Sequence, residues 1–142
     1  MAAARNLGSA LIVRGIHASG AKRQTDLAGA VMHLSRALID APNDAATLTN
    51  LGVAFFYGRQ PDRARENLTQ AKDSAPHYAA PVCNLGHIAR IEHREAEAQG
   101  YQRQHQVLQN RLDAKPKPHY IAQEHVPESV IHHPDPRNSQ AR

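Results

Sequence analysis

The sequence predicts an all-α protein, a short α-solenoid of helix-turn-helix repeats followed by an extended, proline-rich C-terminal tail. Apolar residues recur every three or four positions through the middle of the chain, which is the spacing of one helix face. Short motifs recur at a fixed separation, which is typical of repeat proteins. The chain therefore divides into a leader at 1–25, helical repeats at 26–112 and a tail at 113–142.

The leader, residues 1–25, is basic and contains no acidic residue. Its charged side chains are Arg5, Arg14, Lys22 and Arg23. A segment rich in Ala, Arg and Ser without acids is typical of mitochondrial targeting segments. This composition favours a mitochondrial location over the cytoplasmic alternative.

The first helix of the repeat region is predicted over 26–41. We expect Asp26 to be its N-cap, and Pro42 follows its last turn. Gly58 is expected to end a second helix and Pro61 to begin a third. The remaining helices are predicted at about 45–57, 61–74, 79–92 and 94–112.

Internal repetition has a period of 34 residues. The tripeptide Asn-Leu-Gly occurs at 50–52 and again at 84–86, and Pro42 and Pro76 have the same separation. Pairs of small and large apolar residues follow this period as well. The repeat-defining core is predicted to comprise Leu48, Leu51, Gly52, Phe55, Ala64, Leu68, Ala71, Pro76, Leu85 and Gly86.

This pattern resembles the tetratricopeptide repeat (TPR), a helix-turn-helix unit of 34 residues. The resemblance covers 26–112 and implies about two and a half to three repeats. Gly52 and Ala64 are expected to let two helices approach closely, while Leu68 fills the space between them. Leu48 departs from the pattern, because the family often has Trp there. Gln102 and His105 replace expected core residues in the last helix, as in a polar terminal repeat.

A third Asn-Leu-Gly at 6–8 leaves a second interpretation of the leader open. Residues 2–14 would then form the first helix of the first repeat, with about ten extra residues in the turn that follows, between 15 and 25. The tail, in contrast, has few apolar residues, apart from Tyr120-Ile121 and Val130-Ile131. Each of these pairs is a candidate anchor onto a partner or onto the helices.

The resemblance implies a protein-binding groove lined by the first helix of each repeat. Its expected groove residues are Thr49, Val53, Phe56, Cys83, His87 and Arg90. This face lacks the Lys/Asn/Arg cluster with which some family members hold acidic chaperone tails. An apolar or mixed peptide, or a helix of another subunit, fits it better.

Catalytic and cofactor motifs are absent from the sequence, so we expect no enzyme activity, cofactor or metal. It has no phosphate-binding loop and no paired-cysteine zinc motif. Cys83 and His87 lie four residues apart on one helix face and form the nearest approach to a reactive pair. Beyond the leader, 13 basic residues balance 13 acidic ones, which argues against nucleic-acid binding. No apolar run approaches the length of a membrane span.

The sequence thus predicts a non-catalytic interaction module, a scaffold or accessory subunit of a larger hetero-complex, whose partners are other protein subunits or peptide segments. One alternative is a free adaptor or assembly factor that binds short peptides in the repeat groove. A more distant alternative is a metal-binding protein or enzyme that uses Cys83 and the histidines.

Overall fold

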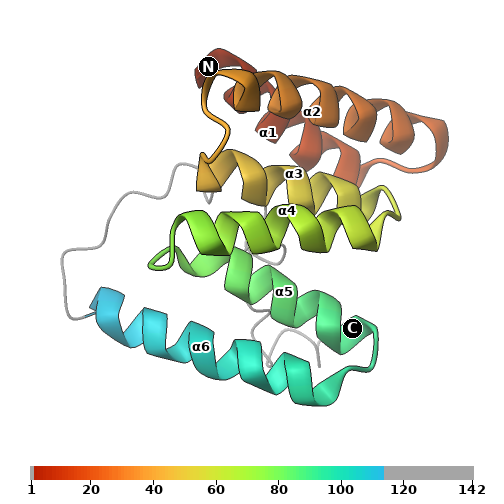
Figure 1. The fold of residues 1–142 in the computed structure, drawn as a ribbon. Coiled ribbons are helices and arrows are strands. Elements are labelled where there is room, and N and C mark those ends of the chain that lie inside the picture. Colours follow the sequence, from red (N-terminus) through yellow and green to blue (C-terminus); the bar gives the residue numbers. More distant parts are fainter. Residues whose placement is uncertain (1, 114–142) are drawn as a thin grey trace.

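The computed structural model describes residues 2–113 and confirms the all-α prediction, since this part of the chain contains six helices and no strand. The predictions for the tail, including its two candidate anchors, lie outside the described residues. The helices are α1 (Ala2–His17), α2 (Gly20–Asp40), α3 (Ala45–Tyr57), α4 (Pro61–Ser74), α5 (Ala79–Ile91) and α6 (Glu95–Asp113) (Figure 1).

Each helix packs against its neighbours in the chain. The most extensive contacts join α1 to α2, α3 to α4 and α5 to α6, and smaller contacts link one pair to the next (Figure 1). The three pairs follow one another in chain order, which gives the molecule a repeat-like arrangement. Most buried apolar residues form one cluster that extends from α1 to α5, and Ala79, Val82 and Leu108 form a smaller one between α5 and α6.

Two expectations for the N-terminal region are wrong. The turn after the first helix contains only residues 18 and 19, because the extra residues lengthen α1 and α2 instead. Asp26 is not an N-cap but lies inside α2 with its side chain buried. Its carboxylate accepts hydrogen bonds from Arg14 of α1, at 2.9 Å from Nε and 2.5 Å from Nη2. The acid therefore joins two helices rather than starting one.

The N-cap that the sequence analysis missed is Asp44, which precedes α3. Its carboxylate accepts a hydrogen bond from the backbone N–H of Thr47 at 3.0 Å and another from the Thr47 hydroxyl. It thereby satisfies one of the free N–H groups in the first turn of the helix. Arg5 of α1 approaches the same carboxylate at 3.3 Å, so α1 is held to the start of α3.

Close approach within the first two helix pairs depends on one glycine in each. A Cβ atom placed on Gly52 of α3 would lie 2.6 Å from Cγ of Leu68 and 3.2 Å from the carbonyl oxygen of Ala64, both on α4. A Cβ on Gly8 of α1 would likewise lie 2.6 Å from Cγ of Leu34 on α2. Since the two distances of 2.6 Å to leucine Cγ atoms are shorter than real Cβ contacts, only glycine permits this packing.

The third pair uses a looser form of the same contact. A Cβ on Gly86 of α5 would lie 3.2 Å from Cβ of Tyr101 and 3.9 Å from the carbonyl oxygen of Ala98 on α6. Gln102, at the position that Leu34 and Leu68 occupy in the other pairs, is exposed. The terminal pair is accordingly held by a narrower apolar strip.

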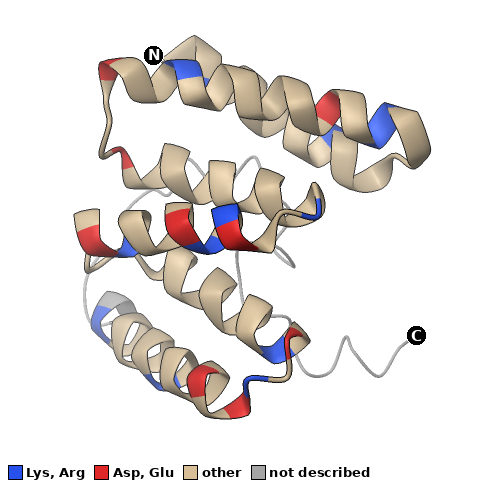
Figure 2. Ribbon diagram, turned by 45° about the vertical axis from the view of Figure 1, so that its right-hand side comes forward, with Lys and Arg blue, Asp and Glu red and all other residues tan. Residues whose placement is uncertain are grey.

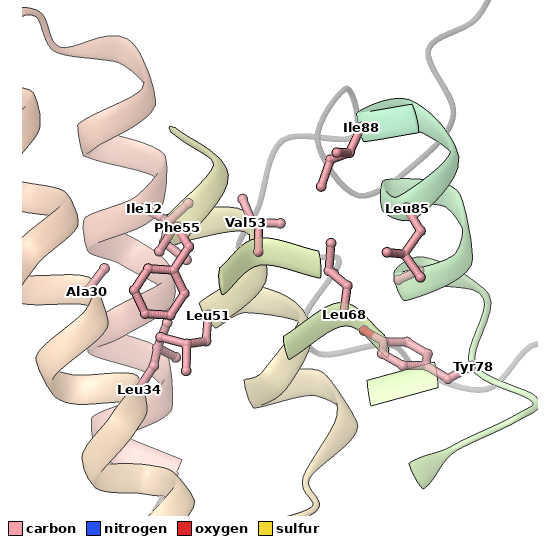
Figure 3. Packing of buried hydrophobic residues seen from close by; sticks show 13 residues of the cluster. Ile12, Ala30, Leu34, Leu51, Val53, Phe55, Leu68, Tyr78, Leu85 and Ile88 are labelled. Carbon is pink, nitrogen blue, oxygen red and sulfur yellow. The ribbon is translucent and has the colours of Figure 1, made fainter. Parts of the chain in front are cut away.

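The repeat-defining residues predicted from the sequence are buried, with the exception of Pro76, which lies exposed in the turn after α4. Figure 3 shows Leu34, Leu51 and Phe55 together where α2 meets α3. Farther along, Leu68 of α4 and Leu85 of α5 belong to the same cluster. These contacts link the three pairs through one cluster, against which Tyr101 of α6 is packed.

Replacing Gly52 by alanine should lower the free energy of unfolding. The new methyl group would collide with Leu68, and overpacking of this kind costs about 1–3 kcal/mol. Gly100 in α6 is the matched control, because a Cβ there meets no atom within 4 Å. Gly100→Ala should instead stabilise the protein by up to about 1 kcal/mol through helix propensity. Urea denaturation measures both, and equal effects of the two substitutions would contradict the close-approach argument.

Asp26→Asn should destabilise the protein at neutral pH and reduce its loss of stability in acid. The hydrogen bonds from Arg14 lower the pKa of Asp26 below its ordinary value of 3.8, and they outweigh the opposing effect of burial. A carboxylate with a lowered pKa contributes stability above the unfolded-state pKa and loses it as the pH falls through the folded-state pKa.

Denaturation of both proteins at a series of pH values from neutral to strongly acidic tests this pair. The difference in stability between wild type and Asp26→Asn should shrink below about pH 4. A difference that stays constant to low pH would show that Asp26 does not act through its charge.

Candidate protein-binding site on helices α3 and α5

The six predicted groove residues lie on two helices, but they differ in accessibility. Thr49, Val53 and Cys83 are buried, whereas Phe56, His87 and Arg90 are half-buried. The accessible part of the predicted face is therefore the C-terminal half of α3 together with that of α5.

Phe56 and His87 are the predicted residues that the fold brings together most closely. Their rings stand edge to face, with centroids 6.2 Å apart and planes inclined at 69°. Tyr57 also packs edge to face against Phe56, with ring centroids 5.3 Å apart. Val53 lines the same crevice between α3 and α5 as these rings. The crevice has a volume of about 10 Å³, which is the space of roughly one water molecule.

Thr49 has a local role. Its hydroxyl donates a hydrogen bond to the carbonyl oxygen of Ala45 at 2.7 Å, one turn earlier in α3. A buried hydroxyl that is satisfied within its own helix offers nothing to a partner. The structure therefore separates Thr49 from the accessible residues of the predicted groove.

Cys83 is a buried thiol. Burial raises its pKa to about 12, and the nearby charge of Arg90 offsets this only in part. Because the thiolate is the reactive form, a thiol with so high a pKa is a weak nucleophile and metal ligand at neutral pH. Its packing on α5 is that of a small apolar residue.

Asn84 is a part of this site that the sequence analysis did not identify. Asn50, its equivalent one period earlier, is buried and donates from Nδ2 to the hydroxyl oxygen of Ser9 at 2.8 Å. Asn84 lines the α3–α5 crevice beside Val53, and its buried Nδ2 has no hydrogen-bond acceptor among residues 2–113. The repeated Asn-Leu-Gly motif contained this signal, because a repeated polar residue next to core positions needs a partner in each copy.

Within the described part of the chain, no group of three or more His, Cys, Asp or Glu side chains is arranged to hold a metal ion. Of the six helices, none combines the length and apolar character that crossing a membrane requires.

Comparison of the chain with protein-family models, with curated proteins and with solved structures found no match. The resemblance to tetratricopeptide repeats therefore stays a prediction that rests on the repeated residues of the chain itself.

Replacement by leucine should change the stability of the protein differently at the two repeated asparagines. Asn50→Leu removes a buried hydrogen bond and leaves the Ser9 hydroxyl without its donor, which should cost about 1–3 kcal/mol. Asn84→Leu removes a donor that has no acceptor, so the stability should change little or rise. Thermal denaturation of the two variants checks this difference. A similar loss of stability in both would show that Asn84 is satisfied in the free protein.

Cys83 should react with the thiol reagent DTNB only after unfolding. At about pH 8 the native protein should show almost no reaction, because the thiol is buried and protonated. Addition of guanidinium chloride should release one equivalent of chromophore. Rapid labelling of the native protein would contradict the assignment of Cys83 to the core and would support a role for its thiol as a nucleophile or metal ligand.

Proposed function

We propose that this chain is a non-catalytic protein–protein interaction module of the tetratricopeptide type and serves as an accessory subunit of a larger assembly. The α3–α5 face is the surface that a partner subunit covers. The recurring glycine–leucine contact in the first two helix pairs supports the repeat assignment, because both pairs solve the same packing problem with the same residue types.

The observation that carries the proposal is the buried Nδ2 of Asn84 in the α3–α5 crevice, which has no acceptor among residues 2–113. A buried donor without an acceptor costs about 1–3 kcal/mol. A carbonyl oxygen of a partner, which needs about the space of the single water molecule that the crevice can hold, would accept a hydrogen bond from this Nδ2. The rings of Phe56 and His87 beside it supply apolar contact area, as residues at the centre of protein interfaces commonly do.

Burial of Thr49, Val53 and Cys83 favours a subunit over a free peptide-binding adaptor. An open groove for an extended peptide needs these side chains accessible, and they are not. The outer face of α2 adds to this argument, because it exposes Met32 and Ile39, seven residues apart, to 61% and 78%. Large apolar side chains exposed on one helix face suit a surface that another protein covers.

A mitochondrial location is part of the proposal. Its support is the basic, acid-free composition of residues 1–25. Fluorescence microscopy of the C-terminally tagged full-length protein, and of residues 1–25 fused to a fluorescent protein, tests it. Uniform cytoplasmic signal from the full chain would contradict it.

Gentle affinity purification of the tagged protein from its own cells, followed by quantitative mass spectrometry, tests the function. We expect a small stoichiometric set of partners. Arg90→Glu, together with Asn84→Leu, should reduce their recovery at least about tenfold by opposing a charge and removing the donor. Arg103→Glu on the exposed face of α6 is the matched control and should leave recovery unchanged.

Circular dichroism must first show that the double variant and Arg103→Glu keep the wild-type helix content and melting behaviour. The absence of stoichiometric partners would contradict the subunit proposal. Equal recovery by every variant would instead show that partners bind elsewhere on the molecule.

A further inference from the structure

A second, larger hollow lies outside the α3–α5 crevice. It is bounded by the first half of α2, the end of α3, the α3–α4 turn and the start of α4, and its volume is about 810 Å³. This lies within the range of about 300–1,000 Å³ that ligand pockets occupy. Three arginines line it, Arg23 from α2, Arg59 from the turn and Arg63 from α4. Figure 2 shows basic residues at this end of α2 and at the neighbouring turn, on the same side of the molecule.

The charge in this hollow is uncompensated. No acidic residue lines it, and among residues 2–113 no carboxylate forms an ion pair with Arg59 or Arg63. The N-terminus of α2 adds to the positive potential, because its first turn contains no acid and Ser19 makes no side-chain capping bond. Other arginines, such as Arg14 and Arg65, form ion pairs with Asp26 and Glu92.

Two of the three guanidinium groups are held in place. Arg23 donates hydrogen bonds to the carbonyl oxygens of Ile16 and Ala18 at 2.9 and 3.0 Å, at the end of α1. Arg63 lies over the ring of Phe55, with Cζ 5.5 Å from the ring centroid. Fixed cations lose little entropy when an anion binds, which raises the affinity of such a site.

Part of the lining of the hollow is apolar. Leu27, Ala28 and Val31 of α2 line it together with Ala54 of α3. A free inorganic anion would contact only the arginines and leave the apolar part of the lining exposed to water. The combination fits a ligand that has negative charge on one side and an apolar side chain on the other.

We propose that this hollow binds an acidic segment of a partner protein, whose Asp or Glu carboxylates meet Arg59 and Arg63 while an adjacent apolar side chain packs against Ala28 and Val31. The proposal rests on the proposed function in that a partner protein presents the anion. Guanidinium groups bind carboxylates through paired hydrogen bonds, which gives both affinity and orientation.

A nucleic acid fits the hollow less well. Single strands require aromatic platforms on which bases stack. Phe55 is 8% exposed and covered by Arg63, and Tyr57 packs edge-on against Phe56. Duplex backbones require a basic stripe along the surface, whereas Figure 2 shows acidic and basic residues mixed along α4.

The backbone conformation at Arg59 allows this arginine to be replaced without strain. Its φ of 60° is left-handed, and its N–H and that of Gln60 close the end of α3 by hydrogen bonds to the carbonyls of Phe56 and Phe55. Glycine is the preferred residue at this position of a helix end. Arg59→Gly therefore removes the cation while keeping or improving the stability of the turn.

The experiment is selection of a random 12-residue peptide library, displayed on phage, against the full-length protein. The test variant is Arg59→Gly combined with Arg63→Met, since methionine retains the apolar cover over Phe55. Arg36→Gln, an exposed arginine of α2 outside the hollow, is the control. Peptides selected by the wild type are then titrated against all proteins by fluorescence anisotropy.

We expect the selected peptides to place Asp or Glu beside Leu, Ile or Phe. Their affinity should fall at least about tenfold in the double variant and remain unchanged in Arg36→Gln. It should also weaken between about 50 and 300 mM salt. Peptides without an acidic excess, or equal binding to the double variant, would overturn the proposal.

Further arms separate the other occupants and the proposed function. Inorganic phosphate and a single-stranded oligonucleotide are tested in the same way, by thermal stabilisation and by binding. If one of them depends on the arginines and no peptide does, that ligand and not a partner segment occupies the hollow. If the selected peptides lose affinity only for Asn84→Leu, the proposal for the hollow is contradicted and the proposed function of the α3–α5 face is supported. If peptides bind through the arginines but no stoichiometric partner is found in cells, the hollow is supported and the proposed subunit function is contradicted.

Discussion

The close approach of paired helices is the constraint on which the rest of this structure depends. Gly52 against Leu68, and Gly8 against Leu34, bring two backbones together at a distance that any side chain in place of glycine would prevent. A chain with only 4% aromatic residues has few large side chains with which to fill a wider gap. Small residues at the crossings therefore replace bulk in the core, and the polar terminal pair, α5 with α6, is held more loosely.

The sequence predicts those parts of the fold that depend on local pattern and repetition. Helix positions and the buried set around Leu48 and Leu68 follow from periodicity, since the same spacing must produce the same contacts in each copy. Asp26 was misassigned because an acid before an apolar run has the signature of an N-cap, and only the pairing with Arg14 of another helix reveals its role. The short α1–α2 turn was missed for a similar reason, because tertiary packing and not local sequence decides how far a helix continues.

The candidate surfaces show the same limit more strongly. Periodicity placed Phe56 and His87 on one face, and they do meet across α3 and α5. It could not show that Thr49 and Cys83 on that face are buried, because burial depends on all neighbouring elements. The hollow with Arg23, Arg59 and Arg63 gathers residues from α2, a turn and α4, and no motif in the sequence relates them. Sites of this kind arise from the stacking of helices and become visible only in three dimensions.

The two surfaces have complementary physical character. The α3–α5 crevice is small and offers a buried donor, whereas the hollow is larger and offers fixed positive charge, so a single partner could use one for position and the other for attraction. The most direct test of membership in an assembly is size-exclusion chromatography of the endogenous, untagged protein from a gently prepared lysate, followed by immunodetection. Elution of nearly all the protein at a mass far above 15.6 kDa is the predicted result. Elution as a monomer would contradict the account.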